Sequence, residues 1–208
     1  DRILRDDFDG EPNWRPNEKG EVLNNDYFGG DLDGIRSKLD YLKDLGVTCI
    51  YLNPIFESHE NHRYNTANYR NVDPLLGTNE DFRELCKAAK VRGISVILDG
   101  VFSHTGADSI YFNKFGRYNT PGAYQSENSQ YPFWGNEEYE SWWGIDTLPN
   151  VDENNPSYTK YICGDDGVLD YWMSLGAAGY RLDVADELPD EFLDNLRTCV
   201  KKYDEEKI

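Results

Sequence analysis

The chain has 208 residues, of which 38% are hydrophobic and 14% aromatic, so it can bury a substantial core. Its 39 acidic residues against 21 basic ones give a formal net charge of −18, which would repel nucleic acids and anionic membrane surfaces. No apolar run approaches the roughly 20 residues of a membrane span, and residues 1–10 lack the apolar stretch of a secretory signal. We therefore expect no nucleic-acid partner, no membrane partner and a cytoplasmic location, with secretion left open.

The four cysteines are scattered and form no C-x-x-C pair, which argues against a metal knuckle or a dithiol redox site. Most of them fall in segments with helix or strand character. We predict that they are small core residues of a protein from a reducing compartment. They are Cys49, Cys86, Cys163 and Cys199.

Helical and extended segments alternate along the chain. The predicted elements are a helix at 34–45, a strand at 47–52, a helix at 78–93, a strand at 94–98, an interrupted helical region at 155–176, a strand at 179–184 and a helix at 189–200. Apolar residues recur at helical spacing in the helices, and Thr78 with Asp81 fits a capping box. This alternation predicts a parallel sheet covered by helices, and hence an α/β fold, either doubly wound or a (β/α)8 barrel.

The connection between the second and third predicted strands is about twice as long as the connection before it. Its residues 105–155 are rich in aromatic side chains, including Trp134, Trp142 and Trp143. A long loop with so much aromatic surface favours a small inserted subdomain over a disordered linker. We therefore predict a subdomain at 105–155 within a domain that spans 1–208.

Polar side chains gather where the predicted strands end. Asp99 ends the second strand and His104 follows it, while Arg181 and Asp183 lie at the end of the third. Each residue alone is more often a cap, a turn former or a packing residue, but parallel strands open their active sites at these ends, so together they favour a site. The same rim is expected to hold the three histidines, His59, His62 and His104. With aromatic side chains nearby and no phosphate-binding loop, a neutral sugar is the favoured ligand.

Segments spread over nearly the whole chain carry further motifs, namely YFGGDLDG at 27–34, NHRYNTANY at 61–69, DGVFSH at 99–104, LPNVD at 148–152 and GYRLDVADE at 179–187. In this order and spacing they resemble the α-amylase superfamily of glycoside hydrolases, family 13, and most closely its neopullulanase and cyclomaltodextrinase branch. The resemblance implies a (β/α)8 TIM barrel, of which this chain would carry about strands 2–4. Residues 105–155 would then be the inserted domain B.

The resemblance also implies an activity, the retaining hydrolysis of α-1,4 or α-1,6 glucosidic bonds in α-glucans. Asp183 would be the nucleophile, and Arg181 would keep its carboxylate ionised and oriented. The implied substrate-binding residues are Arg181, Asp99, His104, Tyr64 and Glu187. Among these, Tyr64 would stack on the sugar.

Departures from the family pattern bear on metal binding, on the activity of the chain alone and on its oligomeric state. Ser103 stands where many amylases have a calcium-binding Asn, so we predict no metal ligand and no cofactor, with calcium at the acidic segment 24–31 as the open alternative. A retaining glycosidase needs a second carboxylic acid about 5–5.5 Å from its nucleophile, and in the family this acid would follow Ile208. We therefore expect the chain alone to be inactive, and a homo-oligomer to cover the open edges of its sheet.

Two other functions are compatible with the same residues. An α-glucan transglycosylase would keep the nucleophile and replace water by a sugar acceptor. A non-catalytic glucan-binding module would keep only Tyr64, Asp99, His104 and the aromatic insertion.

Overall fold

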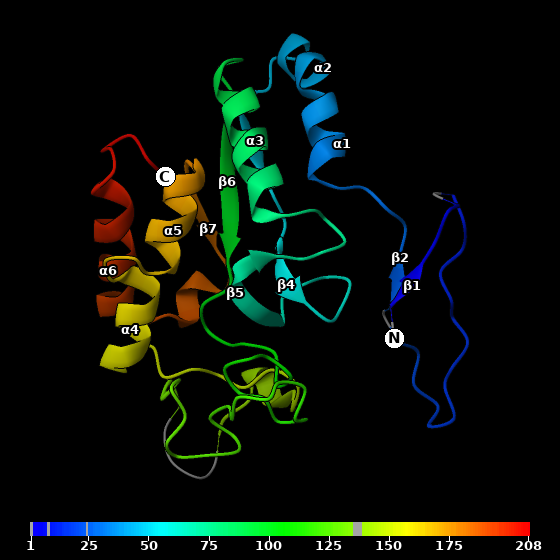
Figure 1. Ribbon diagram of the computed structural model, residues 1–208, viewed down its shortest axis with the longest axis vertical. Coiled ribbons are helices and arrows are strands. Elements are labelled where there is room, and N and C mark those ends of the chain that lie inside the picture. Colours follow the sequence, from blue (N-terminus) through cyan, green and yellow to red (C-terminus); the bar gives the residue numbers. More distant parts are fainter. Residues whose placement is uncertain (1, 8, 24, 135–138) are drawn as a thin grey trace.

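The computed structural model of the protein describes residues 2–7, 9–23, 25–134 and 139–208 (Figure 1). Its elements are β1 (Ile3–Leu4), β2 (Asp26–Tyr27), α1 (Leu32–Ser37), α2 (Leu39–Asp44), β3 (Cys49–Tyr51), β4 (Phe56–Ser58), β5 (Thr66–Val72), α3 (Asn79–Lys90), β6 (Ser95–Gly100), η1 (Trp142–Gly144), α4 (Pro156–Cys163), α5 (Val168–Leu175), β7 (Gly179–Leu182), η2 (Ala185–Glu187) and α6 (Asp190–Lys201). Within these described ranges, no helix is long and apolar enough to cross a membrane.

The central sheet has three parallel strands in the order β3, β6, β7. In its register Tyr51 lies beside Ile97, and Asp99 lies beside Arg181. Strands β6 and β7 therefore end level, and β3 ends beside Ile97 near the same edge, which places the side chains that follow the strands on one rim. The predicted α/β fold with parallel strands is confirmed.

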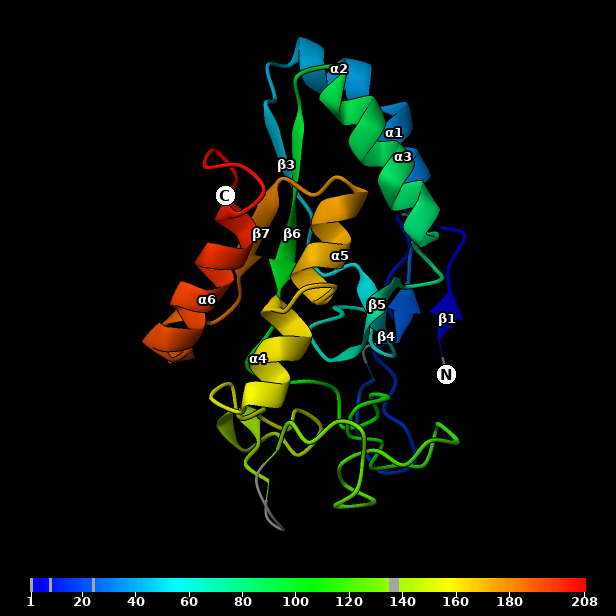
Figure 2. The same ribbon diagram turned by 60° about the vertical axis from the view of Figure 1, so that its left-hand side comes forward.

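Helices cover one face of this sheet, and the other face is open. Val96, Leu98 and Tyr180 are buried in a core to which α3, α5 and α6 contribute, and Figure 2 shows these helices arrayed along β6 and β7. Side chains alternate between the faces of a strand, so Tyr51 and Arg181 project from the opposite face, where both are exposed. The open face is the one that carries the polar residues of the predicted site.

The predicted helices are present with altered bounds. Helix α3 begins at the expected capping box, in which Thr78 Oγ1 accepts from the Asp81 N–H (3.2 Å) and Asp81 Oδ2 accepts from the Thr78 N–H (2.8 Å). The single helix expected at 34–45 is instead divided into α1 and α2. The division arises because the Lys38 N–H bonds to the Ile35 carbonyl (2.9 Å) in a tighter turn.

An antiparallel hairpin, β4 with β5, is an addition that the sequence analysis did not predict. Strand β5 reads TANYRNV, and its polar residues hide the alternation by which Ala67 and Tyr69 are fully buried. The loop between β4 and β5 carries Tyr64. The strand pair β1–β2 also went unpredicted, because each of its strands has two residues and gives no periodic signal.

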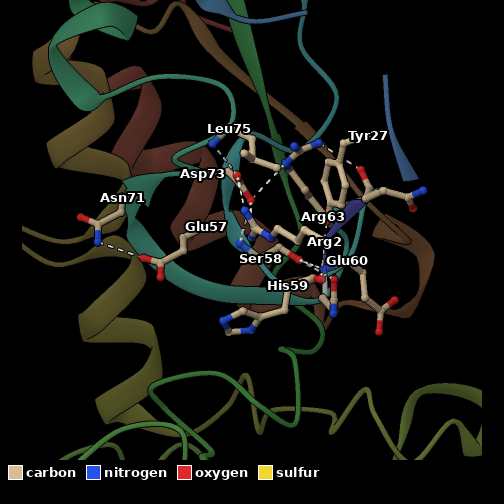
Figure 3. A network of polar contacts seen from close by, with 12 residues as sticks. Arg2, Tyr27, Glu57, Ser58, His59, Glu60, Arg63, Asn71, Asp73 and Leu75 are labelled. Atoms are coloured by element: carbon tan, nitrogen blue, oxygen red, sulfur yellow. Dashed lines mark hydrogen bonds and ion pairs between the residues drawn. The ribbon is translucent and has the colours of Figure 1, made fainter. Parts of the chain in front are cut away.

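A buried carboxylate fixes the Tyr64 loop to the N-terminal segment (Figure 3). The Asp73 side chain is fully buried, and its two oxygens accept from both terminal nitrogens of Arg2 (3.0 and 2.9 Å). Arg63, which is next to Tyr64, has its Nε 3.3 Å from Asp73 Oδ2, and the Leu75 N–H donates to Oδ1 (2.9 Å). Two arginines thus compensate one carboxylate, as a buried charge requires.

The amino-terminal end of β7 is paired on its free side by the backbone of Ile208. The Tyr180 N–H donates to the Ile208 carbonyl (2.9 Å), and the Ile208 N–H donates to the Ala178 carbonyl (3.1 Å). Gly179 lies between these bonds with φ of +152°, and a Cβ there would be 1.7 Å from the Ile208 oxygen, so only glycine fits. This part of the sheet edge is therefore covered from within the chain, and oligomerisation stays a prediction.

One cysteine differs from expectation. Cys86 and Cys199 are buried, but Cys49 is exposed, and all four thiols are free. Cys49 is two residues from Tyr51 on β3, so both side chains project from the uncovered face of the sheet. The prediction of uniformly buried cysteines is therefore wrong at Cys49.

We predict that Asp73→Asn lowers the free energy of unfolding by about 3 kcal/mol, because Arg2 and Arg63 would lose their charge partner in a buried site. Thermal unfolding followed by circular dichroism measures the change. Asp40→Asn is the control, since Asp40 pairs with Arg92 at the surface and should change the midpoint little. Equal midpoints for the two variants would contradict the structural role assigned to Asp73.

Candidate active site at the strand ends

One guanidinium group joins the carboxylates at the ends of β6 and β7. Arg181 Nη1 donates to both oxygens of Asp99 (3.0 and 3.1 Å) and to Asp183 Oδ1 (2.7 Å). The arrangement follows from the register, because Asp99 lies beside Arg181 and alternation places Asp183 on the same side as Arg181. We call Asp99, Arg181, Asp183 and the tyrosines that contact them the carboxylate cluster.

The carboxylate cluster is partly enclosed. The side chain of Asp99 is fully buried and that of Asp183 is 15% exposed, whereas Arg181 is 42% exposed. Burial raises the pKa of Asp99, although hydrogen bonds from Tyr51 and Arg181 oppose the rise. Burial acts to lower the pKa of Arg181, but its bonds to Asp99 and Asp183 outweigh that effect and raise it. The guanidinium therefore stays charged between two acidic groups.

Two tyrosines complete the cluster. The Tyr64 hydroxyl donates to Asp99 Oδ2 (3.3 Å), and its ring stacks on His62 with centroids 6.1 Å apart. The Tyr51 hydroxyl also bonds to Asp99 Oδ2. Tyr51 was not among the predicted site residues, although its place at the end of a predicted strand could have indicated it. Burial raises the pKa of both phenols, so both remain donors at neutral pH.

His104 is a neutral imidazole under the insertion. Its Nδ1 lies 2.9 Å from Ser103 Oγ, and its ring packs against Trp142 with centroids 5.6 Å apart. Burial lowers the pKa of His104, while the Asp183 charge opposes the shift. Its Nε2 is buried and makes no hydrogen bond of standard geometry in the described ranges, although the Tyr64 backbone acts to raise the pKa of the ring.

Glu187 is placed differently from the other predicted site residues. It ends η2, and its carboxylate accepts from the indole nitrogens of Trp142 (2.9 Å) and Trp143 (3.0 Å). Its hydrogen bonds therefore go to the insertion and not to the carboxylate cluster.

The three histidines do not all meet at the cluster. His59 Nδ1 pairs with Asp108 (2.8 Å), and His62 Nε2 pairs with Glu60 (2.6 Å). His62 contacts Tyr64 of the cluster, because its ring stacks on the Tyr64 ring and its Nδ1 accepts from the Tyr64 N–H (3.1 Å), while His59 has a partner outside the cluster.

The acidic side chains of segment 24–31 already have hydrogen-bond partners within the protein. Asp26 accepts from Arg5 Nη1 (3.2 Å) and from the Asn13 N–H (2.9 Å), and Asp31 caps α1 by accepting from the Gly34 N–H (2.7 Å). Asn24 lies outside the described residues. Within the described ranges, no group of three or more histidine, cysteine or acidic residues could hold a metal ion.

Parallel strands with covering helices and functional side chains at their carboxyl ends are the arrangement of α/β barrel enzymes. Residues 6–206 match the family model "Alpha amylase, catalytic domain". The chain therefore belongs to the α-amylase family of glycoside hydrolases, and its three parallel strands are part of a TIM-barrel catalytic domain. The fold and the family inferred from the motifs are confirmed.

Named relatives agree with this family. An amylopullulanase of Thermoanaerobacterium saccharolyticum is 44% identical over 86% of this chain, which covers 16% of that protein. A cyclomaltodextrinase of Thermoanaerobacter pseudethanolicus is 37% identical over 88% of the chain, which covers 32% of it. Among solved structures, the type III pullulan hydrolase of Thermococcus kodakarensis has a TM-score of 0.76 at 32% identity, with 99% of this chain and 35% of that one covered. The chain thus spans between 16% and 35% of the length of these proteins.

We predict that Arg181→Ala lowers the free energy of unfolding by about 3 kcal/mol near neutral pH, because it leaves the buried Asp99 without a compensating charge. Protonation of Asp99 relieves that charge, so the loss should shrink as the pH falls. Chemical denaturation at several pH values measures both effects. Arg92→Ala, which breaks an exposed pair with Asp40, is the control; a loss of stability that does not change with pH would contradict the role of Asp99.

A second pH effect is expected at Glu153, whose pKa burial raises from 4.5 to about 7. Between these values the folded chain binds more protons than the unfolded chain, so Glu153 makes stability fall as the pH rises through this window. Glu153→Gln should raise stability at about pH 8 by about 1 kcal/mol, or about 2–4 °C in the unfolding midpoint, and change little at about pH 4. Glu127→Gln is the exposed control, and a gain that is equal at both pH values would exclude this explanation.

Proposed function

We propose that the carboxylate cluster binds an α-glucan and that Asp183 is the nucleophile of retaining glucosidic-bond hydrolysis. The observation that carries the proposal is the single guanidinium nitrogen of Arg181, which bonds to Asp99 and Asp183 together. The bond orients the Asp183 carboxylate, as a nucleophilic carboxylate requires. The relatives named as amylopullulanase, cyclomaltodextrinase and pullulan hydrolase support an α-glucan substrate and hydrolysis over transfer.

The proposed chemistry assigns a separate task to each side chain. Asp183 attacks the anomeric carbon, the bond to the leaving oxygen breaks, and water later hydrolyses the glycosyl-enzyme ester. Asp99 and the Nε2 of His104 bind hydroxyl groups of the same sugar, while Tyr64 supplies a ring on which it stacks. Residues 105–155 would act as a subdomain that closes over this sugar.

We further propose that this chain by itself turns over α-glucans far more slowly than its relatives do. The leaving oxygen needs a proton from a carboxylic acid about 5–5.5 Å from the nucleophile. Asp99 is the carboxyl group that shares Arg181 with Asp183, and it accepts from Tyr51, Tyr64 and Arg181. These donors favour the ionised form of the Asp99 carboxylate, so it is a poor acid.

Calorimetric titration of the 208-residue chain with maltoheptaose tests the proposal, together with a chromogenic maltoside assay. We expect the chain to bind the oligosaccharide and to show very slow turnover. Asp99→Asn should weaken binding by about tenfold or more, because the loss of a charge-assisted hydrogen bond costs about 1.5–3 kcal/mol. Asp186→Asn, an exposed carboxylate of the neighbouring turn, is the matched control.

The outcomes separate the parts of the proposal. Maltoheptaose binding that survives Asp99→Asn would place the glucan elsewhere. Turnover at the rate of the relatives would overturn the proposed inactivity, and if Asp183→Asn left that turnover unchanged, the nucleophile would be wrong.

A further inference from the structure

Two adjacent tryptophans of the insertion form a stacked pair beside the carboxylate cluster. The rings of Trp142 and Trp143 have centroids 5.3 Å apart and an interplanar angle of 23°. Trp143 is 80% exposed, which is unusual for the largest apolar side chain. An exposed apolar ring beside a polar site is typical of a ligand-binding surface.

Glu187 holds both indoles by their only polar atoms. Its Oε2 accepts from Trp142 Nε1 (2.9 Å), and its Oε1 accepts from Trp143 Nε1 (3.0 Å). An indole has one donor and no acceptor, so these bonds use the whole hydrogen-bonding capacity of both rings. They fix the ring orientation and leave an apolar face for contact. Each carboxylate oxygen of Glu187 accepts one of these two hydrogen bonds.

The backbone supports the same orientation. Trp143 has φ of 52° and ψ of 27°, a left-handed conformation that bulky residues rarely adopt. The turn is closed on both sides, because the Trp142 N–H donates to the Leu148 carbonyl (2.8 Å) and the Ile145 N–H donates to the Trp142 carbonyl (3.0 Å). The exposed ring is therefore held in place by its turn.

The tryptophan pair contacts the proposed sugar site through His104. The Trp142 ring packs against His104, whose Nε2 belongs to the proposed sugar site. Trp142 thus joins the exposed ring of Trp143 to the buried ring of His104. Linked sugar rings present apolar C–H faces at successive positions, and flat aromatic side chains match such faces.

We propose that Trp142 and Trp143 form a platform for a further glucose ring of a bound maltooligosaccharide, and that Glu187 is a positioning residue that orients the platform. The inference rests on the proposed function, since it extends the same glucan along the insertion. It assigns Glu187 a role through the indoles in place of the expected direct contact with sugar, because each of its carboxylate oxygens accepts from an indole N–H.

Titration of the 208-residue chain with maltoheptaose tests the platform. Trp143→Ala should weaken binding by about tenfold, as expected for the loss of one stacked ring. Trp14→Ala is the matched control, since Trp14 is 66% exposed in the segment between β1 and β2 and should leave the affinity unchanged. Equal affinities for Trp143→Ala and the unaltered chain would overturn the platform.

A double-mutant cycle tests the positioning role of Glu187. Glu187→Ala should weaken binding as Trp143→Ala does, and the double variant should bind no more weakly than Trp143→Ala alone, because the residue acts through the ring. Additive losses would show direct contact with sugar and overturn the positioning role. Glu187→Ala should also abolish the far-ultraviolet circular dichroism couplet of the two stacked indoles. Persistence of that couplet would contradict the positioning role of Glu187.

Failure of the platform and failure of the proposed function give different results. If Asp99→Asn weakens maltoheptaose binding and Trp143→Ala does not, the function stands and the platform falls. If the unaltered chain binds no maltoheptaose, both fall. Thermal unfolding of every variant confirms that the chains compared are folded.

Discussion

The charge of Arg181 is the constraint on which the rest of the site depends. Two carboxylates project from neighbouring parallel strands on the same face, and without a shared cation they would repel each other at close range. The guanidinium converts that repulsion into a fixed geometry with Asp99 buried beneath it and Asp183 closer to solvent. The face of the sheet opposite the helices can be polar because these charges compensate one another.

Two segments outside the central sheet, the loop with Tyr64 and the insertion, complete the carboxylate cluster and its surroundings. The loop with Tyr64 depends on the buried Asp73 and its arginines, which tie the loop to the N-terminal segment. The insertion is anchored to β5: the Ile110 N–H donates to the Ala67 carbonyl (3.0 Å), and the Tyr111 hydroxyl accepts from the Tyr69 N–H (2.8 Å). A rigid sheet thus supplies the charges, and separately anchored loops supply the rings around them.

Local patterns in the sequence were sufficient for the helices, the parallel strands and the residues at the strand ends. The hairpin β4–β5 escaped prediction because its polar residues mask the buried Ala67 and Tyr69, and two-residue strands have no periodicity. The site likewise combines residues that could be predicted with contacts that could not. Asp99 and Asp183 could be placed from strand ends, whereas the bonds of Glu187 to the indoles join residues 44 and 45 positions apart and needed coordinates.

The order of strands along the chain has a kinetic consequence. The ion pair between Asp99 and Arg181 joins residues 82 positions apart, and the whole of 105–155 lies between them. Closing so long a loop costs entropy before the contact is gained, so contacts of this kind slow folding. Strand β3 and β6 are nearer in sequence and can pair earlier. By the same argument, we expect the charges at the ends of β6 and β7 to meet later than β3 pairs with β6.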